Sequence, residues 1–134
     1  LQALKNLSPC TRATKIHWLG QVGNISDWYQ LADIFVLSSR YEGFPNALLE
    51  AMASGCACVS FQCDTGPTAV IEHYRNGVLV PPKDVDSLAK VIGQLANDST
   101  LRRELGLHAL EVRSQFHEDK IFGLWNDRLL SLLQ

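Results

Sequence analysis

Two glutamates separated by seven residues are the feature of this sequence with the clearest chemical potential. Glu42 lies in a loop, and Glu50 lies about one and a half turns inside a helix predicted for residues 45–54. Because an α-helix rises only about 1.5 Å per residue, both carboxylates can reach one crevice. Carboxylates accept hydrogen bonds from vicinal hydroxyls such as those of a ribose. The alternative is that Glu42 is a favourable charge near a helix N-terminus and Glu50 a solvated surface residue.

The backbone around this predicted helix start offers a second chemical feature. Gly43 allows close approach to the main chain, and Pro45 suits the first helical position. The amides of Phe44, Asn46 and Ala47 fall where a helix leaves its N–H groups unpaired. The helix dipole adds about half a positive charge there. The segment therefore predicts a binding site for a phosphate or for sugar hydroxyls.

A second loop repeats this arrangement. Thr65 and Gly66 follow the apolar run at residues 57–61 and precede Pro67, which opens a helix predicted for residues 67–74. Two such helix starts after neighbouring strands can face one ligand. The alternative is an ordinary capped helix start.

The elements that must position these loops follow an α/β pattern. Continuous apolar runs predict buried parallel strands at four places, residues 16–19, 33–37, 57–61 and 78–80. Helical stretches alternate with them, which is typical of a Rossmann-like, doubly wound parallel sheet with right-handed crossovers.

After Pro82 the pattern is helical. Asp84 or Asp86 can cap one helix and Ser99 the next, and a third runs to the C-terminus. The last helix carries an apolar stripe made of Ile121, Leu124, Trp125, Leu129 and Leu132. We expect this stripe either to pack on a second copy of the chain or to be poorly ordered, the alternative being that it docks on the core of its own domain.

Composition excludes some function classes. Lys and Arg number 12 against 14 Asp and Glu, a net charge of −2, which argues against nucleic acid as a partner. No apolar run approaches the roughly 20 residues that cross a bilayer. The four cysteines, Cys10, Cys56, Cys58 and Cys63, have no zinc-site spacing and are expected to be buried thiols of a reduced, cytoplasmic protein. Because the chain begins at Leu1 and its only methionine is Met52, we expect it to be a piece of a larger protein.

Several segments together resemble one known family. Residues 42–50 (EGFPNALLE) look like the Glu-x(7)-Glu motif of the retaining glycosyltransferases of family 4. Further segments match the family in order: residues 15–20 (KIHWLG), 32–38 (ADIFVLS), 55–59 (GCACV) and 76–81 (NGVLVP).

The resemblance implies part of a two-domain enzyme of the GT-B fold. Residues 1–134 would be most of the C-terminal domain, which binds a nucleotide-diphosphate sugar, truncated at its N-terminal side and followed by C-terminal helices. The missing N-terminal domain would bind the glycan or lipid-linked acceptor. The implied function is transfer of a sugar with retention in cell-surface polysaccharide biosynthesis, in the cytoplasm, with peripheral association at the inner face of the membrane. No cofactor and no metal are expected.

The family's site residues carry over position by position. Glu42 would be the catalytic-site residue that contacts the donor-sugar hydroxyls, and Glu50 would bind the ribose. The remaining donor-binding positions are Gly43, Phe44, Asn46, Ala47, Thr65 and Gly66. One departure is Ala69, where the family usually has Glu. Together with the missing upstream part, it leaves open a degenerate nucleotide-sugar-binding module without catalysis. A further alternative is another GT-B enzyme such as a sugar-nucleotide epimerase, against which the sequence of residues 42–46 (EGFPN) argues.

Overall fold

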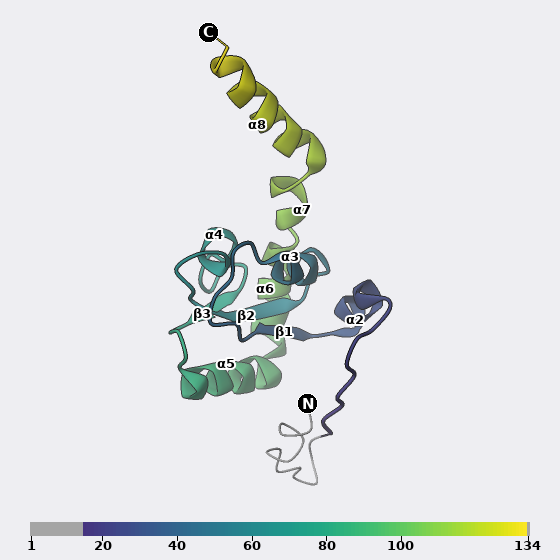
Figure 1. Cartoon of the computed structure of the whole chain (residues 1–134). Helices are drawn as coiled ribbons and strands as arrows, with labels where there is room; N and C mark the ends of the chain where they lie inside the picture. The colour runs from purple at the N-terminus through teal and green to yellow at the C-terminus, as the bar shows by residue number, and fades with distance from the viewer. Residues whose placement is uncertain (1–14, 134) are drawn as a thin grey trace.

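The computed structural model of the chain describes residues 15–133 and contains a three-stranded parallel sheet (Figure 1). The strands β1 (Ile34–Leu37), β2 (Ala57–Phe61) and β3 (Val78–Val80) lie in chain order, with Ile34 opposite Ala57 and Val59 opposite Val78. Helix α3 (Asn46–Ala53) connects the first pair and helix α4 (Pro67–Val70) the second. Three of the four predicted strands are confirmed.

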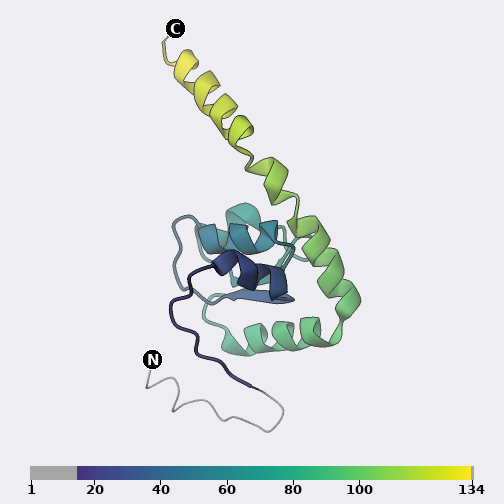
Figure 2. The same ribbon diagram turned by 90° about the vertical axis from the view of Figure 1, so that its right-hand side faces the viewer.

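Helices cover both faces of this sheet, so the α/β prediction is confirmed (Figures 1 and 2). On one face Phe35 and Cys58 pack with the core residues of α2 (Ile25–Leu31), α3 and α4. On the other face Val36 and Val59 pack against α5 (Val85–Asn97) and the first part of α6 (Ser99–Ala109). The side chains alternate because successive strand residues point to opposite faces.

The strand predicted at residues 16–19 is wrong. These residues form no regular element, and Ile16, Trp18 and Leu19 are exposed. An apolar run becomes a strand only where a neighbouring strand takes up its backbone N–H and C=O groups. The sheet of the described residues holds β1, β2 and β3 and gives this run no such neighbour.

Helix α4 is shorter than the predicted 67–74, because a buried side chain replaces the helical hydrogen bonds after Val70. The Asn76 amide nitrogen donates to the Val70 carbonyl at 3.1 Å, and its amide oxygen accepts from the Glu72 N–H at 2.8 Å. Asn76 is fully buried, so this bonding is protected from water. Ile71 consequently leaves the helix in an extended conformation.

The helical half contains four helices where three were predicted. Asp84 caps α5 by accepting the Ser87 N–H at 2.9 Å, which leaves Asp86 as an acidic first-turn residue. Asp98, and not the predicted Ser99, caps α6, since its carboxylate accepts the Leu101 N–H at 2.9 Å. The predicted last helix is preceded by a separate short helix. Helix α7 (Val112–Gln115) ends before Phe116, and α8 (Glu118–Ser131) begins after His117.

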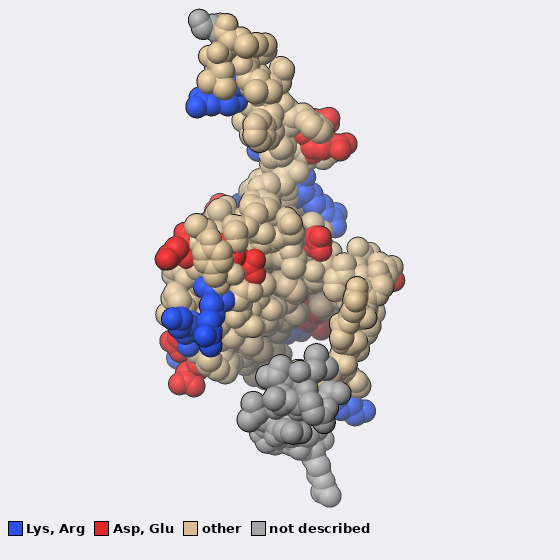
Figure 3. All heavy atoms as spheres, in the orientation of Figure 1, with Lys and Arg blue, Asp and Glu red and all other residues tan. Residues whose placement is uncertain are grey.

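Helix α8 extends away from the rest of the domain (Figures 1 and 2). None of its described residues is buried, and its surface is mostly uncharged (Figure 3). The alternative that the apolar stripe docks on the core of its own domain is therefore wrong. The expectation that α8 pairs with a second copy or is poorly ordered stays a prediction. No helix among residues 15–133 has the length and apolar character needed to cross a membrane.

Three of the four cysteines are described, and they are buried free thiols as predicted. Burial raises the pKa of Cys56, Cys58 and Cys63 above the usual value of a thiol. Cys56 also donates its S–H to the Tyr29 carbonyl at 3.2 Å, which ties β2 to α2. Cys10 lies outside the described residues.

Candidate functional site

The loops that follow β1 and β2 meet at the carboxyl edge of the sheet. The Thr65 hydroxyl donates to the Glu42 carbonyl at 2.6 Å, and the Cys63 thiol donates to the Ser39 carbonyl at 3.3 Å. Both bonds join residues more than twenty positions apart in the chain. In open α/β sheets this edge is where ligands bind. The structure therefore brings together the two loops that the sequence singled out.

Gly66 allows the two loops to come this close. Its φ is +86°, a backbone region that residues with side chains rarely adopt. A Cβ at this position would lie 3.0 Å from the Glu42 Cβ and 3.3 Å from the Glu42 carbonyl oxygen. Gly66 thus has a local reason to be glycine, separate from any contact with a ligand.

The start of α3 offers fewer free amides than the sequence predicted. The Asn46 N–H donates to the Phe44 carbonyl at 3.0 Å, so it is engaged within the turn. The prediction of a free Asn46 amide is wrong, because Pro45 brings the chain into a tight turn before the helix. The Ala47 amide has no backbone acceptor among residues 15–133, and no side chain caps α3. Of the three predicted amides, those of Phe44 and Ala47 therefore have no backbone acceptor in the described part of the chain, and Ala47 lies in the first turn of α3.

Glu50 lies on the outer face of α3, exposed to solvent and beside α2. Its neighbour there is Tyr29: burial raises the pKa of that phenol, and the nearby Glu50 carboxylate raises it further. Glu42 is half-buried in its loop. The two carboxylates thus stand on adjoining elements, one in the loop before α3 and one on the helix itself.

A groove of about 240 Å³ runs along α3 from Glu50 towards α7. Leu49 and Ala53 line its α3 side, and Val112, Arg113 and Phe116 line the other. Phe116 was not predicted as a site residue, because no glycine or proline marks the break between the two helices where it lies. Its aromatic ring in fact contacts Phe44, with ring centroids 6.0 Å apart.

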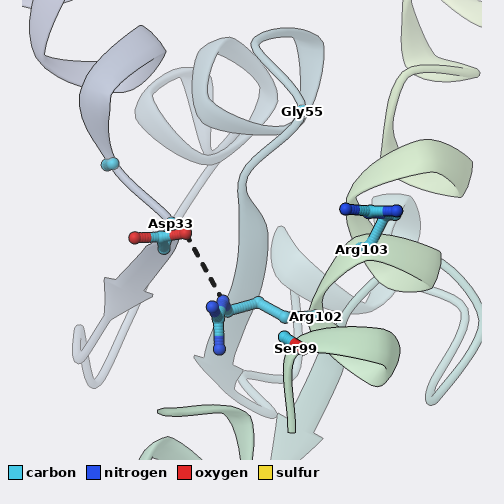
Figure 4. Close-up of a pocket in the computed structure, with 6 residues that line it drawn as sticks. Asp33, Gly55, Ser99, Arg102 and Arg103 are labelled. Carbon is cyan, nitrogen blue, oxygen red and sulfur yellow. Dashed lines mark ion pairs between the residues drawn. The ribbon is translucent and has the colours of Figure 1, made fainter.

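A second cavity, of about 230 Å³, lies at the opposite edge of the sheet and contains none of the predicted site residues (Figure 4). Asp33 and Gly55 border it just before β1 and β2, and Ser99, Arg102 and Arg103 border it from α6. The Arg102 guanidinium lies 3.5 Å from the Asp33 carboxylate and donates to the Leu95 carbonyl at 2.6 Å. These bonds fasten α6 to the sheet and to α5. The charged side chains of Arg102 and Asp33 in this cavity therefore have a structural role.

One Asp-x-Asp sequence is present, at Asp84 and Asp86. Paired carboxylates of this kind are suited to hold a divalent cation beside a phosphate. The Asp84 carboxylate is engaged as a helix cap, accepting both the N–H and the hydroxyl of Ser87, at 2.9 and 2.7 Å. No cluster of three or more His, Cys, Asp or Glu able to hold a metal ion occurs in the described part of the chain.

Comparison with known proteins assigns the family. A model of the glycosyl transferases group 1 matches residues 2–98, which include both loops of the candidate site. The chain belongs to this family. The α/β fold agrees with that of its solved members.

Two relatives and one solved structure illustrate the similarity. The chain is 36% identical over 119 residues to an exopolysaccharide phosphotransferase of Streptomyces coelicolor, covering 88% of this chain and 13% of the relative. It is 36% identical over 106 residues to N,N'-diacetylbacillosaminyl-diphospho-undecaprenol alpha-1,3-N-acetylgalactosaminyltransferase of Campylobacter jejuni, covering 79% and 28%. A TarM mutant of S. aureus, crystallised with fondaparinux, alpha-GlcNAc-glycerol and UDP, superposes with a TM-score of 0.71 at 29% identity, covering 76% of this chain and 21% of TarM. The chain therefore spans less than a third of each of these proteins.

Proposed function

We propose that this chain is the donor-binding part of a retaining glycosyltransferase. The enzyme would transfer a sugar from a nucleoside diphosphate sugar to a glycan or lipid-linked acceptor in cell-surface polysaccharide biosynthesis. The observation that carries the proposal is the contact between the Glu42 loop and the Thr65–Gly66 loop at the carboxyl edge of a group 1 fold. The acceptor named for the C. jejuni relative and the UDP bound to TarM support the two substrate classes.

The proposed roles follow the positions of the side chains. Glu42, in the loop, contacts hydroxyls of the donor sugar. Glu50, exposed on α3 beside Tyr29, accepts hydrogen bonds from the ribose hydroxyls. The Ala47 amide and the positive end of the α3 dipole face the distal phosphate. Phe44, Asn46, Thr65 and the glycines Gly43 and Gly66 shape the backbone around the donor.

Catalysis in this proposal rests on positioning and on charge. The bond between the sugar and the diphosphate breaks, and the developing negative charge on the leaving phosphate is stabilised by donors already in place. Glu42 is assigned no nucleophilic role. No cofactor or metal is part of the proposed reaction, and Asp84 keeps its structural role as a helix cap.

The acceptor half of the site belongs to a second domain in this proposal. Residues 1–134 correspond to the nucleotide-sugar-binding C-terminal domain, and by themselves they bind donor without transferring sugar. The buried free thiols of the described residues fit a reducing, cytoplasmic setting. Peripheral attachment of the intact protein at the inner face of the membrane belongs to the proposal because the proposed acceptor class includes lipid-linked glycans.

Two other functions are favoured by specific observations. A donor-binding module without catalysis is favoured by Ala69, which stands where the family usually has Glu. Transfer of a sugar phosphate is favoured by the similarity to the Streptomyces phosphotransferase. The two transfer reactions differ in their released product: glycosyl transfer leaves a nucleoside diphosphate, whereas sugar-phosphate transfer leaves a nucleoside monophosphate.

A screen of nucleotide sugars on the intact protein tests these functions. Calorimetry measures binding of UDP- and GDP-sugars, and chromatography identifies the released nucleotide in the presence of membrane-extracted acceptors. Binding with release of nucleoside diphosphate supports the proposal. Binding without turnover supports the non-catalytic module, and release of nucleoside monophosphate supports phosphotransfer. Absence of any nucleotide-sugar binding would overturn all three.

A further inference from the structure

An aromatic contact links the C-terminal helices to the Glu42 loop. The ring of Phe116 lies 6.0 Å from the ring of Phe44, with an interplanar angle of 64°, an edge-to-face arrangement. Phe44 lies two residues after Glu42 and immediately before the proline that opens α3. A shift of the Phe44 ring therefore acts on the backbone that carries Glu42.

Phe116 lies at the boundary between an anchored helix and a free one. On its N-terminal side α7 is held to the domain: Val112 is buried, and the Arg113 guanidinium donates to the Ala53 carbonyl at 2.7 Å. On its C-terminal side His117 is extended, with φ −61° and ψ 140°, and α8 leaves the domain with no buried residue. The direction of α8 is therefore set within a residue of the ring that contacts Phe44.

The same ring also borders the other carboxylate. Phe116 and Glu50 both line the groove between α3 and α7. Thr65 and Gly66 hold the Glu42 loop on its β2 side, and Phe116 contacts it from the α7 side. Phe44 is 54% exposed, so few other atoms restrain its ring.

We propose that Phe116 is a positioning residue for the donor loop: its ring holds Phe44 and, through Phe44, the Glu42 backbone in the geometry that transfer requires. Phe116 does not touch the donor and acts only through its neighbour. The inference rests on the proposed function, since it assigns the Glu42 loop to donor binding. It adds that the position of this loop depends on the junction between α7 and α8.

The test compares four single variants of the intact protein and the Phe44→Ala/Phe116→Ala double variant. Phe116→Ala removes the ring, Phe116→Tyr retains it, and Phe44→Ala removes its partner. Phe122→Ala is the matched control, because Phe122 is an exposed α8 phenylalanine at 69% exposure. An aromatic pair of this kind corresponds to about a threefold to tenfold effect on a rate. We expect Phe116→Ala to lower kcat by that factor while the Kd for bare nucleoside diphosphate stays within about twofold.

Rescue and coupling separate positioning from general destabilisation. Phe116→Tyr should restore kcat, and Phe122→Ala should leave it unchanged. In the Phe44→Ala background, Phe116→Ala should have no further effect, because the ring it held is gone. An unchanged kcat in Phe116→Ala, or effects that add in the double variant, would overturn the proposal.

A second readout needs no substrate. Hydrogen exchange of residues 40–46 should be faster in Phe116→Ala than in the wild type or in Phe122→Ala. If no nucleotide sugar binds the wild-type protein, the proposed function fails. The exchange measurement then still shows whether the contact between Phe116 and Phe44 restrains residues 40–46. Unchanged exchange in Phe116→Ala would then show that Phe116 does not hold the loop.

Discussion

The hydroxyl of Thr65 donates a 2.6 Å hydrogen bond to the backbone carbonyl of Glu42, which joins the loop after β2 to the loop after β1. The bond goes to the main chain, so the Glu42 carboxylate remains available to a ligand. Gly66, the next residue, lies so close that a Cβ there would be 3.0 Å from the Glu42 Cβ. The position of Glu42 therefore depends on two residues of a neighbouring loop.

Replacing Gly66 with alanine should destabilise the protein and displace Glu42. The φ of +86° costs a residue with a side chain about 1–3 kcal/mol, and the new Cβ would press on Glu42. Urea unfolding should show a decrease of that size in the free energy of unfolding. Hydrogen exchange should become faster at residues 40–46.

Gly93→Ala is the matched control for that substitution. Gly93 lies inside α5, and a Cβ there would meet no atom within 4 Å. Alanine should stabilise the helix by about 0.5–1 kcal/mol. Equal effects of the two substitutions would show that the contact between Gly66 and Glu42 does not restrain the loop.

Glu50→Ala in the intact protein should weaken the binding of bare nucleoside diphosphate. The proposed hydrogen bonds to ribose hydroxyls involve a charged acceptor, so their loss corresponds to about tenfold or more in Kd. Calorimetry with UDP measures the change. Glu104→Ala, which removes an exposed carboxylate of α6, should leave the affinity unaltered. An unchanged Kd in Glu50→Ala would remove the ribose assignment.

Glu42→Ala should lower the rate of sugar transfer and leave the binding of bare nucleoside diphosphate unchanged. Because its proposed partners are hydroxyls of the transferred sugar, bare nucleotide should bind as in the wild type while the rate of transfer falls. Removing a hydrogen bond to a charged group corresponds to about tenfold or more in kcat/KM. Parallel calorimetry and turnover assays check both parts. A collapse of nucleotide affinity in Glu42→Ala would mean that the roles of the two glutamates are exchanged.

Much of the sheet was predictable because its strands are short and apolar on both faces. The continuous apolar run at residues 57–61 predicts a central strand, and every residue of β2 is buried. The run at residues 16–19 is also largely apolar, but it has no neighbouring strand among residues 15–133, and apolar character alone does not supply one. The end of α4 was not predictable from local preference, since it depends on the buried amide of Asn76.

The candidate site was predictable in its parts but not in its contacts. The spacing of Glu42 and Glu50 indicated one crevice. The structure puts the two residues on adjoining elements, and the groove beside Glu50 is not lined by Glu42, so a shared crevice stays a prediction. The engaged amide of Asn46 and the Thr65 hydrogen bond depend on turn geometry, which residue types do not determine. Phe116 was missed because the break between α7 and α8 has no glycine or proline to mark it.

The cap of α5 predicts a pH dependence of stability. Hydrogen bonds from the N–H and the hydroxyl of Ser87 lower the pKa of Asp84 below its usual value of about 3.9. A group with a lowered folded-state pKa stabilises the protein above the unfolded-state pKa, and this contribution disappears as the pH falls through the folded-state pKa. Asp84→Ala should therefore lower the free energy of unfolding at neutral pH, and its difference from wild type should shrink below about pH 4.

Asp86→Ala serves as the control for that titration. Asp86 is a first-turn residue of the same helix, and its side chain does not form the cap. Urea titrations of both variants between neutral and acidic pH provide the comparison. A constant difference between Asp84→Ala and wild type across the whole range would show that the ionised form of the cap contributes nothing.

The uncovered stripe of α8 predicts self-association of the 134-residue chain. Trp125 is 62% exposed, and Leu124, Leu129 and Leu132 continue the same stripe. Large contiguous apolar surfaces on soluble proteins are usually covered by a partner, and in a solution of this chain the available partner is a second copy. Light scattering should therefore show a mass that rises with concentration. Trp125→Glu should abolish that rise, because a carboxylate in the paired stripe would be buried without a counter-charge.

Asn126→Glu is the control for this prediction: it adds the same charge beside the stripe, and the variant should associate like the wild type. A wild-type chain that stays monomeric at every concentration would show that the exposed stripe does not drive pairing.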